Sequence, residues 1–151
     1  MKNLILLFVL STVLSSCSTD ADEISLNKED IYGKWNLVKM TGSFGNSLTT
    51  GEDMEWQESY NFNRDGTFIK SRSRDGELTE AAGTFVITEN DSQFNDPLIN
   101  FSIEIEFSNS NSIAASCYSG GMKEELYFRG DRMLSNYHAC DGPGLEYKKS
   151  K

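Results

Sequence analysis

The chain contains a single histidine, His138, in 151 residues, which leaves little material for imidazole chemistry. It has no His-Glu-x-x-His pair and no Gly-x-Ser-x-Gly elbow, the motifs that would indicate a zinc hydrolase or a serine hydrolase. His138 would have to act as the only imidazole base. The sequence therefore predicts that the protein is not an enzyme and has no catalytic residue.

Basic residues are also scarce, since 14 Lys and Arg stand against 23 Asp and Glu, a formal net charge of −9. A surface of this sign repels nucleic acids and anionic lipid head groups, so we expect no nucleic-acid partner. Some of the acids, such as Glu104 and Glu106, alternate with apolar residues, which places them on a solvated strand face where they oppose aggregation.

No hydrophobic run is long enough for a transmembrane helix, which needs about 20 predominantly apolar residues. The longest begins at Leu4, ends at Leu10, follows the positive charge of Lys2 and precedes small polar residues. This order is typical of a secretory signal peptide, which we assign to residues 1–16. The following segment, residues 17–30, is polar and acidic and has the composition of a solvated tether.

The segment Leu14-Ser15-Ser16-Cys17 resembles the bacterial lipobox. The resemblance implies that the Cys17 thiol is diacylated, that cleavage makes Cys17 the first mature residue, and that its amino group gains a further chain such as palmitate. Two or more acyl chains give a durable membrane anchor. An ordinary secreted protein with a stray cysteine is the alternative. Residues 18–23 also resemble the acidic stretch of surface-exported lipoproteins of the Bacteroidota, so we expect an outer-membrane lipoprotein facing either the periplasm or the medium.

Two further cysteines, Cys117 and Cys140, remain in this exported chain, and such a pair normally oxidises. The predicted disulfide would stabilise the fold by roughly 3 kcal/mol on a chain-entropy estimate. A metal site built from His138, Asp141 and both cysteines is disfavoured, because zinc sites usually recruit closely spaced ligand pairs. We therefore expect no metal and no cofactor.

Beyond the tether the pattern has a period of two. Apolar and polar residues alternate over residues 99–107, which indicates a strand with one buried face. A second alternating face covers residues 54–62, where Glu58 shares the apolar side. Glu58 therefore points into the barrel or sits where this face meets solvent. An inward carboxylate needs a partner, either a basic group or a ligand, because an unpaired buried charge costs several kcal/mol. Shorter strand candidates are 35–41, 67–71, 83–88, 112–117, 124–128, 132–138 and 145–148.

Residues 63–66, 74–76 and 129–131 supply the turn chemistry that joins antiparallel neighbours. The only helical element we expect is a short turn over residues 28–32. Eight to ten strands in one domain, residues 31–151, predict an all-β meander closed as a barrel or a sandwich.

The phrase Gly33-Lys34-Trp35 resembles the Gly-x-Trp opening of lipocalin-like domains, and the segments 60–68, 83–87 and 126–134 resemble hairpins of small lipocalin-like lipoproteins of the Bacteroidota. The resemblance implies an antiparallel up-and-down barrel in which Trp35 plugs one end and either Arg129 or Arg132 packs across it.

The same resemblance implies a binding module for a small apolar or amphipathic ligand. The candidate interior residues are Trp35, Trp56, Glu58, Tyr60, Phe62, Phe101 and Phe107. In so short a chain these residues would equally fill a solid barrel. The alternative is therefore a non-catalytic interaction or structural lipoprotein (an inhibitor, adaptor or assembly subunit) that meets another envelope protein. An enzyme acting on an envelope substrate is the least favoured hypothesis.

Overall fold

The computed structural model describes residues 26–42, 47–89 and 98–151. The predicted signal peptide, Cys17 and most of the tether lie outside the described residues. Within the described ranges, no helix is long and apolar enough to cross a membrane.

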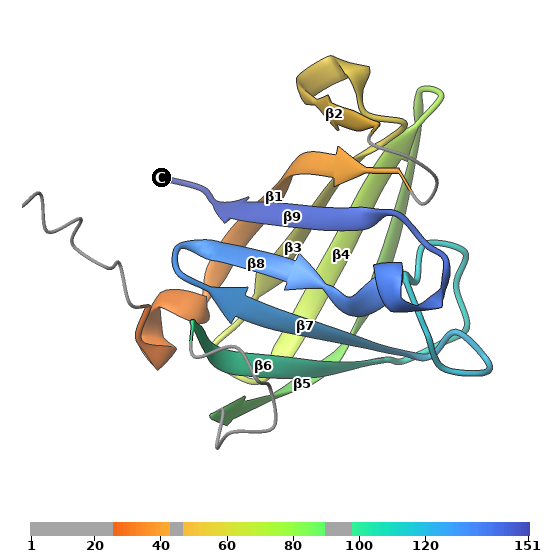
Figure 1. Ribbon diagram of the computed structural model, residues 1–151. Coiled ribbons are helices and arrows are strands. Elements are labelled where there is room, and N and C mark those ends of the chain that lie inside the picture. Colours follow the sequence, from red (N-terminus) through yellow and green to blue (C-terminus); the bar gives the residue numbers. More distant parts are fainter. Residues whose placement is uncertain (1–25, 43–46, 90–97) are drawn as a thin grey trace, which may run out of the picture.

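The described residues form one antiparallel sheet that closes on itself (Figure 1). The strands are β1 (Gly33–Thr41), β2 (Leu48–Thr50), β3 (Gln57–Phe62), β4 (Thr67–Arg74), β5 (Glu77–Glu89), β6 (Ile99–Phe107), β7 (Lys123–Arg129), β8 (Arg132–Ser135) and β9 (Gly144–Lys149). Sequential neighbours pair from β3 to β9, and β1 pairs with both β3 and β9. The result is an eight-stranded up-and-down barrel of the lipocalin-like kind, to which β2 adds one short strand at the edge of β1. The predicted all-β barrel is confirmed.

The hairpin turns form where the sequence predicts them. Arg74 pairs with Glu77 across the two-residue loop Asp75-Gly76, in which both residues have positive φ (54° and 83°), as a type I′ turn requires. Arg129 pairs with Arg132 across a second two-residue loop that begins with Gly130 at φ 58°. These tight turns fix the strand register and therefore decide which side chains face inward.

One end of the barrel is closed by the 3-10 helix η1 (Lys28–Ile31), which confirms the predicted helical turn. Its capping box is formed by Asn27 and Asp30. Trp35 is fully buried beside η1, and its indole N–H donates to the Ile31 carbonyl at 2.8 Å. The ring that packs edge-on against Trp35 is Phe128, at 5.2 Å between centroids. The described ion pairs of Arg132 go to Asp131 and Glu146.

Two strand predictions are wrong. Residues 112–117 form no strand, because their backbone groups bond side chains inside the barrel instead of a neighbouring strand. The last hairpin strand ends at Ser135, and residues 136–140 form the 3-10 helix η3 (Asn136–Cys140), whose first turn is capped by the Ser135 hydroxyl. A third 3-10 helix, η2 (Gly51–Asp53), and strand β2 were not predicted.

The close approach of β5 to β6 depends on Gly83. A Cβ at this position would overlap the backbone of Glu106 on β6, so the two strands approach too closely for any larger residue. We predict that Gly83→Ala lowers the free energy of unfolding by about 1–3 kcal/mol or more. Ala82→Gly, at the exposed neighbouring position, should cost only about 0.5–1 kcal/mol. Urea denaturation of both variants measures the difference, and equal midpoints would contradict the close approach.

Candidate functional site at the capped mouth of the barrel

The interior of the barrel contains four charged side chains near its mouth, the end opposite η1. They are Glu58 on β3, Lys70 and Arg72 on β4, and Glu124 on β7. On each strand they are an even number of residues from buried aromatic or aliphatic residues, so their side chains share the inner face of the barrel. Lys70 and Glu124 are fully buried, and Glu58 is 5% exposed.

These charges pair with one another. The Lys70 ammonium lies 2.8 Å from Glu124 Oε1 and 3.2 Å from Glu58 Oε1, so it bridges both carboxylates. Arg72 Nε donates to Glu58 Oε2 at 2.5 Å. Two cations therefore meet two anions, and the formal charge of the cluster is zero. Of the two alternatives for Glu58, the structure shows the inward one, and the partners are the cations Lys70 and Arg72.

Two buried tyrosines complete the shell of the carboxylates. Tyr147 donates its hydroxyl to Glu58 Oε1 at 2.5 Å, and Tyr60 donates to Glu124 Oε2. Burial, and after it the charge of Glu124, raises the pKa of Tyr60 well above its ordinary value. Burial and then Glu58 raise the pKa of Tyr147 in the same way. Both phenols therefore stay protonated at neutral pH and remain donors to the carboxylates.

The mouth is covered by the β6–β7 connection, residues 108–122, which we call the mouth segment. Its residues Ile113 and Ala115 are buried. Arg72 Nη2 donates to the Ile113 carbonyl at 3.0 Å, and the Ala115 N–H donates to Glu124. Backbone groups that a strand would have paired with a neighbour are thus satisfied by the buried charges.

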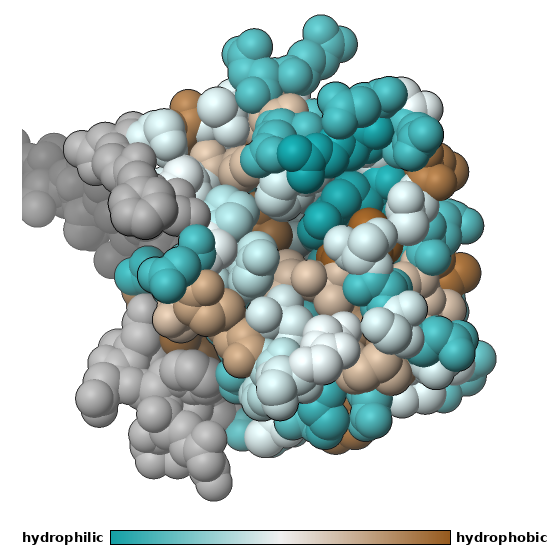
Figure 2. All heavy atoms as spheres, turned by 90° about the vertical axis from the view of Figure 1, so that its right-hand side faces the viewer, coloured by the Kyte–Doolittle hydropathy of each residue, from teal (hydrophilic) through white to brown (hydrophobic). Residues whose placement is uncertain are grey.

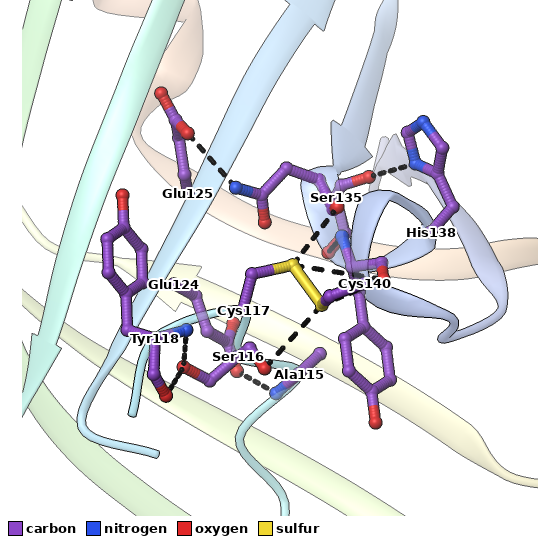
Figure 3. Close-up of a disulfide and its surroundings, with 11 residues drawn as sticks. Ala115, Ser116, Cys117, Tyr118, Glu124, Glu125, Ser135, His138 and Cys140 are labelled. Atoms are coloured by element: carbon purple, nitrogen blue, oxygen red, sulfur yellow. Dashed lines mark hydrogen bonds between the residues drawn. A yellow bond between two sulfur atoms is a disulfide. The ribbon is translucent and has the colours of Figure 1, made fainter. Parts of the chain in front are cut away.

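The predicted disulfide between Cys117 and Cys140 is confirmed, with 5.6 Å between the two Cα atoms. Figure 3 shows that it ties the mouth segment to η3. A hydrogen bond of 3.0 Å from Asn136 to Glu125 holds η3 against β7 from the other side. The mouth segment is therefore fixed covalently at Cys117 and by hydrogen bonds at its buried residues.

Trp56 precedes β3 and packs against two arginines of β4. The guanidinium of Arg72 lies 4.4 Å from the indole centroid, and that of Arg74 lies 5.7 Å from it. Trp56 is 7% exposed, and its indole N–H has no acceptor among the described residues. Among the predicted interior residues, Trp56 is the one whose buried donor group lacks a partner in the described part of the chain.

The structure brings the predicted interior residues together. Trp35, Tyr60, Phe62 and Phe107 are 1% exposed or less, and Phe101 packs against the core while partly exposed. Tyr60 stacks on Phe62 at 5.7 Å between centroids and meets Tyr147 edge-on at 5.2 Å. Their rings contact one another and other core rings, so the predicted lining forms a packed interior in the described residues.

Sequence analysis missed Lys70, Arg72 and Glu124. The sequence pattern could have indicated them. Lys70 and Arg72 lie two and four residues after the buried Phe68, and Glu124 lies two and four residues before the buried Leu126 and Phe128, so they share the inner faces of their strands. These residues were not predicted to face inward, because charged side chains are rarely buried unless they are paired, and their partners lie on other strands.

The described residues line at least three surface recesses. One, about 430 Å³, lies on the outer face of β1, β3, β4 and β5, and small polar residues such as Ser59, Ser71 and Ser73 line it. Two others, about 330 and 320 Å³, border Gly42. The described residues contain no group of three or more His, Cys, Asp or Glu side chains that could hold a metal ion.

Comparison with models of protein families, with curated proteins and with solved structures finds no match for this chain. The relation to lipocalin-like lipoproteins therefore stays a prediction from sequence, and the site must be interpreted from its own geometry.

Lys70 offers the sharpest test of the buried cluster. We predict that Lys70→Met lowers the free energy of unfolding by about 3–5 kcal/mol, because it leaves two buried carboxylates without their shared cation. Lys123→Met removes a surface lysine that contacts Glu104 and Glu106, and it should cost less than about 1 kcal/mol. Denaturant unfolding followed by tryptophan fluorescence measures both, and similar losses would refute the central role of Lys70.

Proposed function

We propose that this chain is a lipid-anchored, non-catalytic protein of the cell envelope that binds a protein partner through the outside of a filled barrel. The observation that carries the proposal is the packing of the described interior. Aromatic rings fill the half near η1, and the self-neutralised cluster fills the half near the mouth. This arrangement favours the interaction hypothesis over the carrier hypothesis.

The energetics of the mouth support this choice. A ligand entering the barrel would have to displace the mouth segment and leave Arg72 and Glu124 without the backbone groups that they bind. Leaving a buried hydrogen-bonding group unsatisfied costs about 1–3 kcal/mol, and more for charged groups. The Cys117–Cys140 disulfide adds a covalent constraint against this opening. The outer surface needs no such rearrangement.

The anchor follows from the lipobox resemblance at Cys17. The acidic tether, residues 17–30, would hold the barrel away from the bilayer, since its charges favour solvent over anionic head groups. In this proposal the chain belongs to the outer membrane, where lipid attaches it and the barrel is presented to its partner.

One observation supports the carrier hypothesis: the buried N–H of Trp56 has no acceptor among the described residues. Buried polar groups nearly always have partners, so a small ligand with an acceptor atom beside Trp56 is the second candidate function. Such a ligand would lie near the Arg72 guanidinium.

Native mass spectrometry of the full mature chain, extracted from its own membrane, tests the proposal. We expect the mass of the lipidated polypeptide, lowered by two hydrogens for the disulfide, with no small molecule released on denaturation. A released small molecule would contradict the filled barrel and support the carrier hypothesis.

Two variants control the experiment. Cys17→Ser should lose the lipid mass and leave the membrane fraction. Phe107→Ala removes a buried ring from the core and should create an apolar cavity that takes up added benzene. Uptake by Phe107→Ala and not by the unmodified chain would show that the method detects an occupied interior.

A further inference from the structure

Part of one edge of strand β5 has no strand partner among the described residues. This strand pairs with β4 along Glu77–Thr84, but its pairing with β6 begins only at Gly83. The last backbone bond on the β6 side is the one from the Ser108 N–H to the Ala82 carbonyl, at 2.9 Å. Among the described residues, no strand lies along the β6-side edge of Glu77–Ala81, which we call the free edge. Figure 1 shows this part of β5 with β4 as a ribbon that extends beyond the end of β6.

The register identifies the backbone groups on the free edge. A two-residue turn makes Arg74 and Glu77 a hydrogen-bonded pair, and hydrogen bonding to the neighbouring strand then alternates along β5. The N–H and C=O groups of Glu77, Thr79 and Ala81 therefore point to β4, while those of Leu78 and Glu80 point to the free edge. The outward direction of the Ala82 carbonyl agrees with this alternation.

The charge of the free edge is negative. Glu77 and Glu80 have no cation partner among the described ion pairs, and Glu80 accepts a hydrogen bond from the Ser71 hydroxyl at 2.8 Å. The neighbouring cations are already engaged, since Arg72 pairs with Glu58 and Arg74 pairs with Glu55. Figure 2 shows hydrophilic residues gathered over the upper part of the mouth end, where Figure 1 places β2 and the β4–β5 turn.

The negative charge of the free edge favours one kind of binding partner over a second copy of this chain. Glu80 lies on the outer face of β5 and Glu77 on the opposite face, because side chains alternate along a strand. Antiparallel pairing of two free edges would bring the Glu80 side chains of both copies close together on one face, and like charges on neighbouring strands are destabilising. A basic strand would instead place a lysine or arginine beside Glu80 on the outer face. Leu78, which is 68% exposed, gives such a strand an apolar contact beside the 430 Å³ recess.

We propose that the free edge binds an extended, basic segment of a partner protein by strand addition. This proposal rests on the proposed surface-binding function and names the chemistry of the partner. Main-chain hydrogen bonds to Leu78 and Glu80 supply affinity, and the Glu80 carboxylate selects a basic sequence. The charge also protects the edge against pairing with a second copy.

The test uses the full mature chain, labelled with ¹⁵N, and two end-capped pentapeptides in which valine alternates with lysine or with glutamate. We expect the lysine peptide to bind and the glutamate peptide not to bind. Binding should slow hydrogen exchange of the Leu78 and Glu80 amides, which have no strand partner among the described residues. The Thr79 and Ala81 amides are already bonded to β4 and should change little.

Variants separate strand addition from general charge attraction. Glu80→Pro removes a free-edge N–H without removing a bond to β4, and it should weaken the lysine peptide at least tenfold. Glu80→Gln should weaken it severalfold, whereas Glu104→Gln, which loses the same charge on the outer face of β6, should leave it unchanged. Glu80→Gln also keeps the proposal testable if the proline variant does not fold.

Equal binding after Glu80→Pro, slowed exchange on another strand, or no binding of the lysine peptide would each overturn the proposal. Failure of the proposed function gives a different result, namely a small molecule released in native mass spectrometry. That result concerns the barrel interior, whereas peptide binding concerns only the free edge.

Discussion

The ammonium of Lys70 lies between two buried carboxylates, and the interior of the barrel is arranged around this bridge. Burying a charge is costly unless it is paired and its remaining hydrogen-bonding groups are satisfied. Here Glu58 and Glu124 each accept from Lys70, from a tyrosine, and from one further donor, Arg72 or the Ala115 N–H. The cluster thus uses side chains from separate strands together with backbone of the mouth segment, so it links the wall of the barrel to its cover.

This link explains why we assign function to the outside of the molecule. An open carrier needs a mouth whose cover can leave at low cost, whereas here departure of the mouth segment would remove the backbone partners of buried Arg72 and Glu124. In our proposal the closed barrel is a scaffold for β5 where this strand extends past β6. Fold alone does not decide between carriers and interaction proteins, so the choice depends on these particular contacts.

Much of the fold follows from local pattern. The alternation over residues 99–107 predicts β6, the Asp75-Gly76 turn predicts its hairpin, and the inward parity of Glu58 predicts a paired carboxylate. The partners of Glu58 were not predicted, because Lys70 and Arg72 lie on another strand and pairing across strands depends on register and closure. Residues 112–117 look like a strand because they contain apolar residues, but Ile113 and Ala115 are buried by covering the mouth.

If the buried cluster holds the cover in place, the mouth segment should be as stable as the strands beneath it. Native-state hydrogen exchange of the Ala115 amide tests this most directly, because Ala115 lies outside any helix or strand and bonds only to buried Glu124 among the described contacts. We expect the Ala115 amide to exchange as slowly as core amides in β7, through global unfolding alone. Exchange at the rate of an exposed loop would show that the mouth opens readily, which would contradict the filled, covered barrel.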